Sequence, residues 1–398
     1  MIRYLPIFLN LKPYEFHRKI CYGRLFVGGD KMIREFKSPA HYIQGKDVLT
    51  KRVGEIKNYG TNVLLLADDD VWEIVGEKFA EAMKEEGLDV YREPFNGEAS
   101  ESEIERVVEI GKEEESDVVI GLGGGKAIDS AKAIADDLKC SVIIAPTIAS
   151  TDAPTSGLSV IYSDDGVFEG YRFYDSNPDL IMLDTGVVAQ APPSFLAAGI
   201  ADAAATYVEA RAVQKAQGET MVGGYQTLAG MAIAEACRDT IFKYGKQALA
   251  SVEAGVVTQA LENVVEANTL LSGLGFESGG LAAAHAIHNG FTAVDGDIHD
   301  KSHGEKVAYG ILTQLFLENA EKEEIDEYIE FFQDIGMPTT MEDLALDEVD
   351  DEGLLSIGEL TLDEDETIHN MAEDFTPDDI VDALKAVDSY VKINFPKE

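Results

Sequence analysis

Apolar runs and helical patterns alternate along the first half of this chain. Short apolar runs, expected as strands, lie at Asn62–Ala67 and at 117–122, 141–145 and 180–183. Between them, apolar residues recur at helical spacing, for example over 72–86 and 101–115. Strands that alternate with helices predict a parallel sheet with helices on both of its faces.

The pattern changes near Pro192, after which long Ala-rich and Glu-rich helical patterns replace the strands. We therefore expect an α/β domain over 32–190 and an all-helical domain over 191–398, with the active site in the cleft between them. Residues 1–31 carry six Lys and Arg against two acidic residues, unlike the rest of the chain. They lack the apolar core and cleavage site of a targeting peptide. We expect a non-native or disordered extension, with Met32 as the natural start.

A glycine-rich turn follows the second predicted strand. Gly123, Gly124 and Gly125 end an apolar run, and a helical pattern starts at once. Glycines let backbone amides approach a ligand closely, and a helix N-terminus favours an anion, so a dinucleotide pyrophosphate is the expected ligand. The pattern matches neither G-x-G-x-x-G nor the P-loop, and a tight turn without a ligand is the alternative. Lys126 favours the phosphate site, because a cation beside the glycines suits phosphate.

The first strong strand ends in Asp68, which is followed by two further aspartates. A carboxylate at this place in a nucleotide-binding fold accepts hydrogen bonds from a ribose 2′-hydroxyl and repels a 2′-phosphate. Asp68 therefore predicts NAD rather than NADP as the cofactor. The alternative is a solvated acidic turn, which an acidic protein readily accommodates.

Composition restricts the partners of this chain. It has 398 residues, 45% of them hydrophobic, and 32 Lys and Arg against 74 Asp and Glu give a formal net charge of -42. This balance argues against binding to nucleic acid or to an anionic membrane. Concentrated salt would screen the self-repulsion, so we expect a halophilic source with a high-salt cytosol. Three widely spaced cysteines and no membrane-length apolar run favour a cytoplasmic protein.

Histidines gather in one segment of the helical half. Four of the seven lie within residues 278–306, namely His285, His288, His299 and His303. Asp202 stands alone in an apolar small-residue helix, where a buried carboxylate is costly unless it is paired or bound to a cation. One Asp and two His with an open position are typical of a catalytic divalent-metal site, and these donors suit Zn²⁺ or Fe²⁺. The alternative is that Asp202 and His285 are hydrogen-bonded core residues.

Six motifs stand out between residue 32 and the C-terminus. They read GGGKAIDSAK, PTIASTDAPTSGLSVIY, NPDLIMLDT, AGIADAAATYVEAR, ESGGLAAAHAIHNG and HGEKVAYG. Together they resemble the glycerol dehydrogenases of the iron-containing, or group III, alcohol dehydrogenase family. The resemblance implies a dehydroquinate synthase-like nucleotide-binding α/β domain followed by a helical metal-binding domain.

The resemblance also implies roles for individual residues. The metal ligands would be Asp202, His285 and His303. Relatives that use iron often have a further His where this chain has Thr206, which favours zinc here, with Fe²⁺ as the alternative. Asp152 would contact the substrate and act in catalysis. His288 would act as a proton relay, with a supporting or core role as the alternative.

The implied cofactor contacts fall on three segments. They are Asp68, Gly124, Gly125, Lys126, Ala127, Ile128, Asp129, Thr147, Ile148, Ala149, Ser150, Ser156, Leu158 and Tyr162. Ala127 departs from the family, because many relatives have Thr at that position and so one more hydroxyl for the phosphate.

The implied activity is NAD-dependent, metal-dependent oxidation of glycerol, and of other vicinal diols, by a homo-oligomer such as an octamer. Glycerol-1-phosphate dehydrogenase and dehydroquinate synthase are alternatives on related folds, but the substrate-side motifs STDAPTSG and HAIHNG supply no Arg or Lys for a phosphate. Another metal-dependent alcohol dehydrogenase of the same family is also an alternative. A non-catalytic binding protein would not explain an open metal site beside a nucleotide loop.

Overall fold

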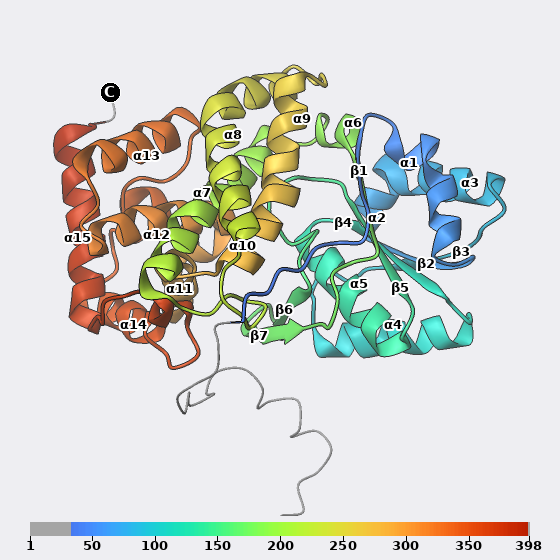
Figure 1. Ribbon diagram of the computed structural model, residues 1–398, viewed down its shortest axis with the longest axis horizontal. Coiled ribbons are helices and arrows are strands. Elements are labelled where there is room, and N and C mark those ends of the chain that lie inside the picture. The colour runs from blue at the N-terminus through green and yellow to red at the C-terminus, as the bar shows by residue number, and fades with distance from the viewer. Residues whose placement is uncertain (1–32, 397–398) are drawn as a thin grey trace, which may run out of the picture.

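The computed structural model describes residues 33–396, and the expected extension at 1–31 lies outside them (Figure 1). The strands are β1 Tyr42–Gly45, β2 Asn62–Ala67, β3 Asp89–Pro94, β4 Val118–Gly123, β5 Ser141–Pro146, β6 Leu158–Tyr162, β7 Phe168–Phe173 and β8 Leu180–Asp184. The helices among them are α1 Val48–Lys51, α2 Asp69–Val71, α3 Glu77–Glu85, α4 Glu101–Glu113, α5 Gly125–Leu138 and α6 Thr185–Val188. The later helices are α7 Pro193–Ala216, α8 Leu228–Glu253, α9 Gln259–Glu266, α10 Ser272–Gly279, α11 Ala283–Gly290, α12 His303–Leu317, α13 Lys322–Asp334, α14 Asp351–Thr361 and α15 Pro377–Asn394.

Six strands form one parallel sheet in the order β1-β8-β5-β4-β2-β3. Successive residues of a strand face opposite sides of a sheet, and β2 shows the consequence. Val63 and Leu65 pack in the cluster that contains Phe79 of α3, whereas Leu64 and Leu66 pack with α4 and α5. Both faces are therefore covered by helices, which explains the continuous apolar runs in the sequence (Figure 1). The predicted fold class is confirmed.

The sequence patterns missed four strands. β1 and β3 lie at the two edges of the sheet, and β3 has mostly polar or half-buried residues. β6 and β7 pair as a separate antiparallel hairpin. Edge strands and small hairpins have a solvated side, so their apolar signal is weak. The helix expected over 72–86 is present but contains a π-helical turn, Trp72–Gly76.

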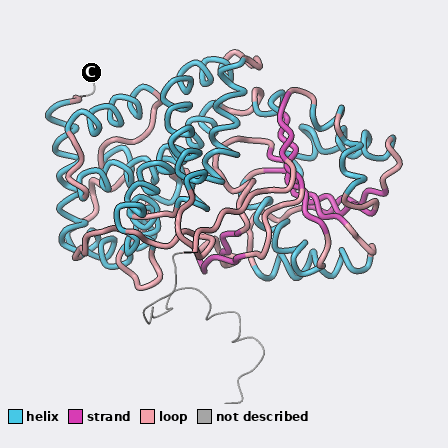
Figure 2. The backbone as a smooth tube through the Cα atoms, in the orientation of Figure 1, coloured by secondary structure: helices cyan, strands magenta, loops and turns pink. Residues whose placement is uncertain are grey.

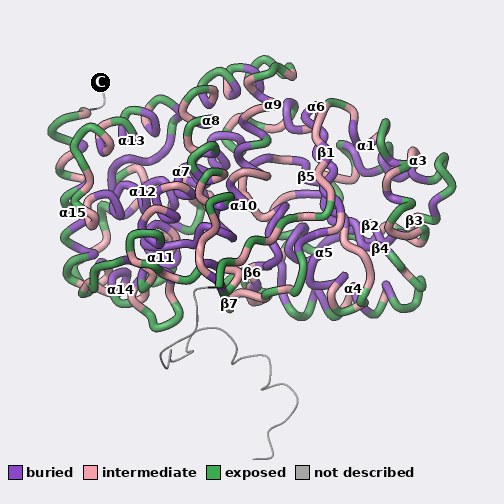
Figure 3. The backbone as a smooth tube through the Cα atoms, viewed as in Figure 1, coloured by how far each residue is buried: buried purple, intermediate pink, exposed green. Residues whose placement is uncertain are grey.

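Helices dominate from Pro193 onward, as expected (Figure 2). Their shared core draws residues from α7 to α15 and is separate from the two clusters that flank the sheet. Buried backbone gathers around α7, α11 and α12 in Figure 3. Whether 32–190 and 191–398 fold as independent domains stays a prediction. Within residues 33–396, none of the helices has both the length and the apolar character of a bilayer span.

The loop after β5 brings the two regions together. Gly199 of α7 lies so close to this loop that a Cβ there would overlap the carbonyl oxygen of Ala149. Asn268 donates to the same carbonyl oxygen at 3.0 Å. The end of β5, where the sheet places its ligand-binding loops, therefore packs directly against the helix that carries Asp202.

Candidate metal and nucleotide site

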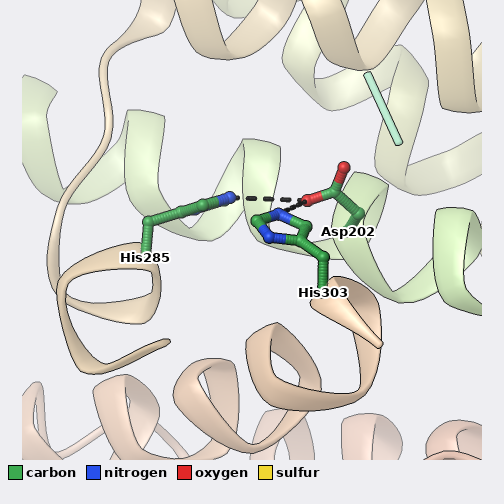
Figure 4. Close-up of side chains that lie close together, drawn as sticks. All are labelled: Asp202, His285 and His303. Atoms are coloured by element: carbon green, nitrogen blue, oxygen red, sulfur yellow. Dashed lines mark hydrogen bonds and ion pairs between the residues drawn. The ribbon is translucent and has the colours of Figure 1, made fainter. Parts of the chain in front are cut away.

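Asp202, His285 and His303 come together from three helices (Figure 4). Asp202 Oδ1 lies 3.4 Å from His285 Nε2 and 3.0 Å from His303 Nε2. The three ligand atoms lie within 4.8 Å of one another, and no other such group occurs among residues 33–396. One carboxylate oxygen and two imidazole nitrogens at this spacing fit a divalent cation of the zinc or iron type.

The local sequence determines where His303 lies. Ser302 and Glu305 form a reciprocal capping box, so α12 begins at His303. The next residue must be glycine, because a Cβ on Gly304 would overlap the backbone of Ala198 on α7. The helix start therefore approaches α7 closely and brings His303 to the turn that carries Asp202.

The neighbouring histidines keep the buried Asp202 carboxylate ionised. Asp202 is only 1% exposed, and burial by itself would raise the pKa of its carboxyl group. The neighbouring His303 and His285 outweigh burial and lower the pKa of Asp202 far below its ordinary value. A permanently ionised carboxylate among imidazoles is the state that binds a metal cation.

Glu209 orients the ring of His285. Its Oε2 lies 2.6 Å from His285 Nδ1, and its Oε1 accepts the backbone N–H groups of Ala282 and His285 at 2.9 and 3.0 Å. Burial by itself would lower the pKa of His285, but the carboxylates of Glu209 and Asp202 raise this pKa well above its ordinary value. The contact holds a proton on Nδ1, so a cation bound here would replace the proton on Nε2 and take Nε2 as its ligand.

The second histidine of the cluster, His303, has a different partner. His303 Nδ1 lies 3.2 Å from His288 Nε2, and His288 Nδ1 lies 3.0 Å from Asn289 Oδ1. Asn289 in turn donates to both carboxylate oxygens of Glu366 at 3.0 and 3.1 Å. Burial, with the charges of His303 and His285, lowers the pKa of His288 well below its ordinary value. A neutral His288 can therefore accept the Nδ1 proton of His303.

Asp152, the predicted substrate residue, lies beside the cluster of Asp202, His285 and His303. Its backbone N–H donates to Asp202 Oδ2 at 3.2 Å, and Ser272 donates to its Oδ2 at 2.7 Å. The Ser272 hydroxyl also lies 2.8 Å from that of Thr206. Burial, followed by the charge of Asp202, raises the pKa of Asp152 well above its ordinary value.

The glycine turn has the predicted form. β4 ends at Gly123, Gly124 is the N-cap, and the 14-residue helix α5 begins at Gly125. Because β4 and β5 are parallel neighbours, Gly123 pairs with Pro146, and the N–H of Thr147 donates to the carbonyl of Gly123. The glycine turn and the segment Thr147–Ser150 are therefore adjacent.

The structure gives several predicted cofactor residues other contacts. Lys126 is half exposed, forms an ion pair with Glu98 and lies 5.7 Å from the ring centre of Tyr162. Asp68 caps α2, because its Oδ1 accepts the N–H of Val71 at 2.7 Å.

Asp129 is 6% exposed and pairs with Lys132. Its carboxylate also accepts the N–H of Val160 at 3.1 Å. Its cofactor role stays a prediction, as do those of Ala127, Ile128, Ile148, Ala149, Ser150, Ser156 and Leu158.

Sequence reasoning missed Glu209, although a signal was present. Glu209 follows Asp202 by seven residues on one helix, so both lie on the same face, and both stand among apolar neighbours. His299 was a candidate from its position in the sequence alone. Its Nε2 instead bonds the carbonyl of Val294 at 2.9 Å, away from the cluster.

An open pocket of about 530 Å³ lies where β1 meets α9. It is lined by Tyr42, Gln44, Gly45, Gln259, Glu262, Asn263 and Glu266. None of the predicted cofactor, substrate or metal residues lines it, so this pocket is distinct from the site described above.

Comparison with known proteins agrees with this geometry. Residues 39–185 match the family model described as iron-containing alcohol dehydrogenase. "Glycerol dehydrogenase 1" of Schizosaccharomyces pombe is 48% identical over 358 residues, which cover 90% of this chain and 79% of that protein. "Glycolaldehyde reductase" of Halobacterium salinarum is 47% identical over 357 residues, 90% of this chain and 98% of that protein.

The crystal structure of glycerol dehydrogenase from Schizosaccharomyces pombe superposes with a TM-score of 0.88 at 46% identity. The match covers 91% of this chain and 92% of that one. Identity at this level over nine-tenths of the chain shows common descent with these proteins. The chain therefore belongs to the iron-containing alcohol dehydrogenase family.

Proposed function

We propose that the protein is an NAD-dependent glycerol dehydrogenase. Glycerol would lose a hydride from C2 to NAD⁺ and a proton from its C2 hydroxyl, giving dihydroxyacetone, NADH and H⁺. The observation that carries the proposal is the cluster of Asp202, His285 and His303 beside Asp152 and next to a glycine-turn nucleotide loop. The names of the relatives support glycerol as the substrate.

Asp202, His285 and His303 would hold one divalent cation, for which we propose zinc. A cation there would supply a Lewis acid that lowers the pKa of a substrate hydroxyl. Thr206 supports zinc over iron, because its hydroxyl bonds Ser272 and supplies no further nitrogen ligand. Fe²⁺ is the alternative that metal analysis would distinguish.

The residues around the cluster have separate tasks in this proposal. Asp152 would accept hydrogen bonds from the glycerol hydroxyls, with its carboxyl group held by Ser272. Glu209 and His288 would keep the protons of the two histidine ligands on Nδ1. A proton relay through His288 would require its contact with His303 to break, so its present contacts favour an orienting role.

The cofactor would lie along the carboxyl ends of β2, β4 and β5. Its pyrophosphate would meet the amides of Gly124 and Gly125, with Lys126 near the phosphates once it leaves Glu98. Asp68 would accept the adenosine ribose hydroxyls and exclude a 2′-phosphate, which makes NAD the preferred dinucleotide. The second oxygen of Asp68 is available for this contact, because only Oδ1 caps the helix.

We also propose a homo-oligomer, such as an octamer, in a high-salt cytosol of a halophilic source. The net charge of -42 supports the salt adaptation, because self-repulsion at this charge is tolerated best where ions screen it. The oligomer rests on the family resemblance alone.

The central test is the variant His285→Ala, with His299→Ala as its matched control. His285→Ala should lose glycerol oxidation and bound zinc while keeping its helical circular dichroism, because the metal loses one of three ligands. His299→Ala should keep both, because His299 bonds only Val294. Full activity of metal-free His285→Ala would exclude the metal assignment. Assays in molar KCl with glycerol and glycerol 1-phosphate, with and without chelator, would separate the two substrates.

A second activity deserves the same assay, because a relative 47% identical to this chain is named glycolaldehyde reductase. Glycolaldehyde also carries oxygens on adjacent carbons, so Asp152 and the metal ligands could orient it as they would dihydroxyacetone. NADH oxidation with glycolaldehyde should be compared with NADH oxidation with dihydroxyacetone. A kcat/KM higher by more than about tenfold for glycolaldehyde, about 1.4 kcal/mol in transition-state binding, would make reduction of that aldehyde the main activity.

A further inference from the structure

Lys132 on α5 is a buried cation that the proposed chemistry does not use. It is 3% exposed, and a buried ammonium group is costly unless its donors are satisfied. Its Nζ donates to the carbonyls of Ala153 and Leu158 at 2.5 and 2.7 Å, and lies 3.4 Å from the Ser156 hydroxyl. Asp129 Oδ1 is its fourth partner at 3.2 Å. Three of the four partners belong to residues 153–158, which comprise the loop before β6 and the first residue of that strand and are called loop 153–158 below.

Glu277 on α10 holds the same loop from the helical side. It is 3% exposed, and its carboxylate accepts the N–H of Gly157 at 2.8 Å and the side-chain amide of Asn177 at 2.6 Å. Asn177 also donates to the carbonyl of Thr155 at 2.9 Å. The loop therefore lies between a buried cation from the nucleotide-binding helix and a buried anion from the helical region.

The loop connects the groups that must act together. Asp152 directly precedes it, and the backbone N–H of Asp152 donates to the metal ligand Asp202. Ser156 and Leu158 are proposed cofactor contacts, and Lys132 bonds both of them. A movement of this loop would displace the substrate carboxylate relative to the metal and the nicotinamide.

We propose that Lys132 and Glu277 are positioning residues that clamp loop 153–158 from two sides and thereby hold Asp152 in register with the metal ligands and the cofactor. Neither touches the reacting atoms; both act through the loop backbone. The proposal rests on the proposed function in its assignment of Asp152 to the substrate and of the neighbouring residues to the metal and the cofactor. The clamp itself is a statement about the loop and can be measured without turnover.

The test uses Lys132→Met, Glu277→Gln and the double variant in the zinc-loaded enzyme. Lys132→Met keeps an unbranched side chain that is one atom shorter and removes every side-chain donor. The matched control is Lys139→Met at the C-cap of the same helix, because Lys139 is exposed and pairs with Asp136 three residues before it. Four quantities are measured: kcat and KM for glycerol, the Kd of NADH without substrate, and the hydrogen-exchange rate of the loop amides.

Both single variants should exchange the amides of 153–158 at least about tenfold faster, because a local opening costs less without the clamp. The KM for glycerol should rise, and kcat/KM should fall by about 100-fold, as expected when the Asp152 carboxylate is displaced by about 1 Å. Zinc content should stay unchanged. The fold-decrease in kcat/KM of the double variant should be smaller than the product of the fold-decreases of the two single variants, because both residues act on one loop. Lys139→Met should match the wild type.

Unchanged loop exchange in a folded Lys132→Met would overturn the proposal. So would a fall in kcat that tracks the loss of folded protein while KM stays constant, since that marks a purely structural role. If Lys132→Met does not fold, the same measurements on Glu277→Gln test the proposal. If the wild type does not oxidise glycerol, the proposed function fails. Loop exchange and NADH binding then still test whether Lys132 and Glu277 hold the loop in place.

Discussion

The contact between Glu209 and His285 leads to a quantitative prediction for Glu209→Gln. The substitution keeps the size of the side chain, and Oε1 can still accept the two backbone N–H groups of Ala282 and His285. The second oxygen, which faces His285 Nδ1 at 2.6 Å, becomes an NH2 group. Two donors then face each other, and the ring must lose this bond or move its proton to Nε2, the atom that would bind the proposed metal.

The expected loss follows from the contact and its burial. Removing the outer partner of a histidine ligand costs about 10-fold to 100-fold in metal affinity, which is about 1.4 to 2.7 kcal/mol. Glu209 is 0% exposed and its bond to Nδ1 is charge-assisted, so water cannot replace it. We therefore expect Glu209→Gln to lower the zinc affinity by about 100-fold, the upper end of this range.

The assay is a competition titration of metal-free protein with a chromophoric zinc chelator at pH 7.5. Glu103→Gln is the matched control, because Glu103 is also buried and also accepts a backbone N–H, from Asn96 at 3.0 Å, far from the metal cluster. Its zinc affinity should equal that of the wild type. A change below about threefold in folded Glu209→Gln would refute the role of Glu209 in orienting His285.

Three further predictions concern the cofactor, pH and salt. Asp68→Asn keeps the helix cap but removes the charge, so kcat/KM should shift toward NADP by at least about tenfold, whereas exposed Asp70→Asn should not change it. Burial raises the pKa of Glu366 from 4.5 to about 7, so its protonated form stabilises the fold fully below pH 4.5 and this contribution is lost as pH rises through about 7. Between pH 5 and pH 7.5, the free energy of unfolding measured with urea should fall by at most about 3 kcal/mol more in the wild type than in Glu366→Gln. An equal fall in both proteins would contradict this prediction. The melting temperature should rise steadily from 0.1 to 2 M KCl, because the net charge of -42 is increasingly screened, and a flat response would argue against salt adaptation.

Much of the fold followed from local patterns. The buried strands β2, β4, β5 and β8 appear as apolar runs because helices cover both faces of the sheet. The glycine turn was visible because three successive glycines before a helix mark a tight turn, and the positive φ of Gly123 is a conformation that favours glycine. Asp202 and His285 stood out because a lone polar residue among apolar neighbours needs a partner.

Other features have no local signal. The edge strands β1 and β3 and the hairpin β6–β7 depend on pairing with distant strands, and their polar side hides the period of two. Lys132 resembles any charged residue of an amphipathic helix, and only its contacts with 153–158 identify it as buried.

The sequence by itself therefore determined the buried strands, the change to helices, the glycine turn and the polar residues that must be satisfied. Only the tertiary structure decided which groups satisfy them: Glu209 for His285, His288 for His303, and Lys132 with Glu277 for the loop. The reason is physical. Periodicity reports the burial of a residue within its own element, whereas a hydrogen bond between residues 76 or 120 positions apart exists only after the elements have packed.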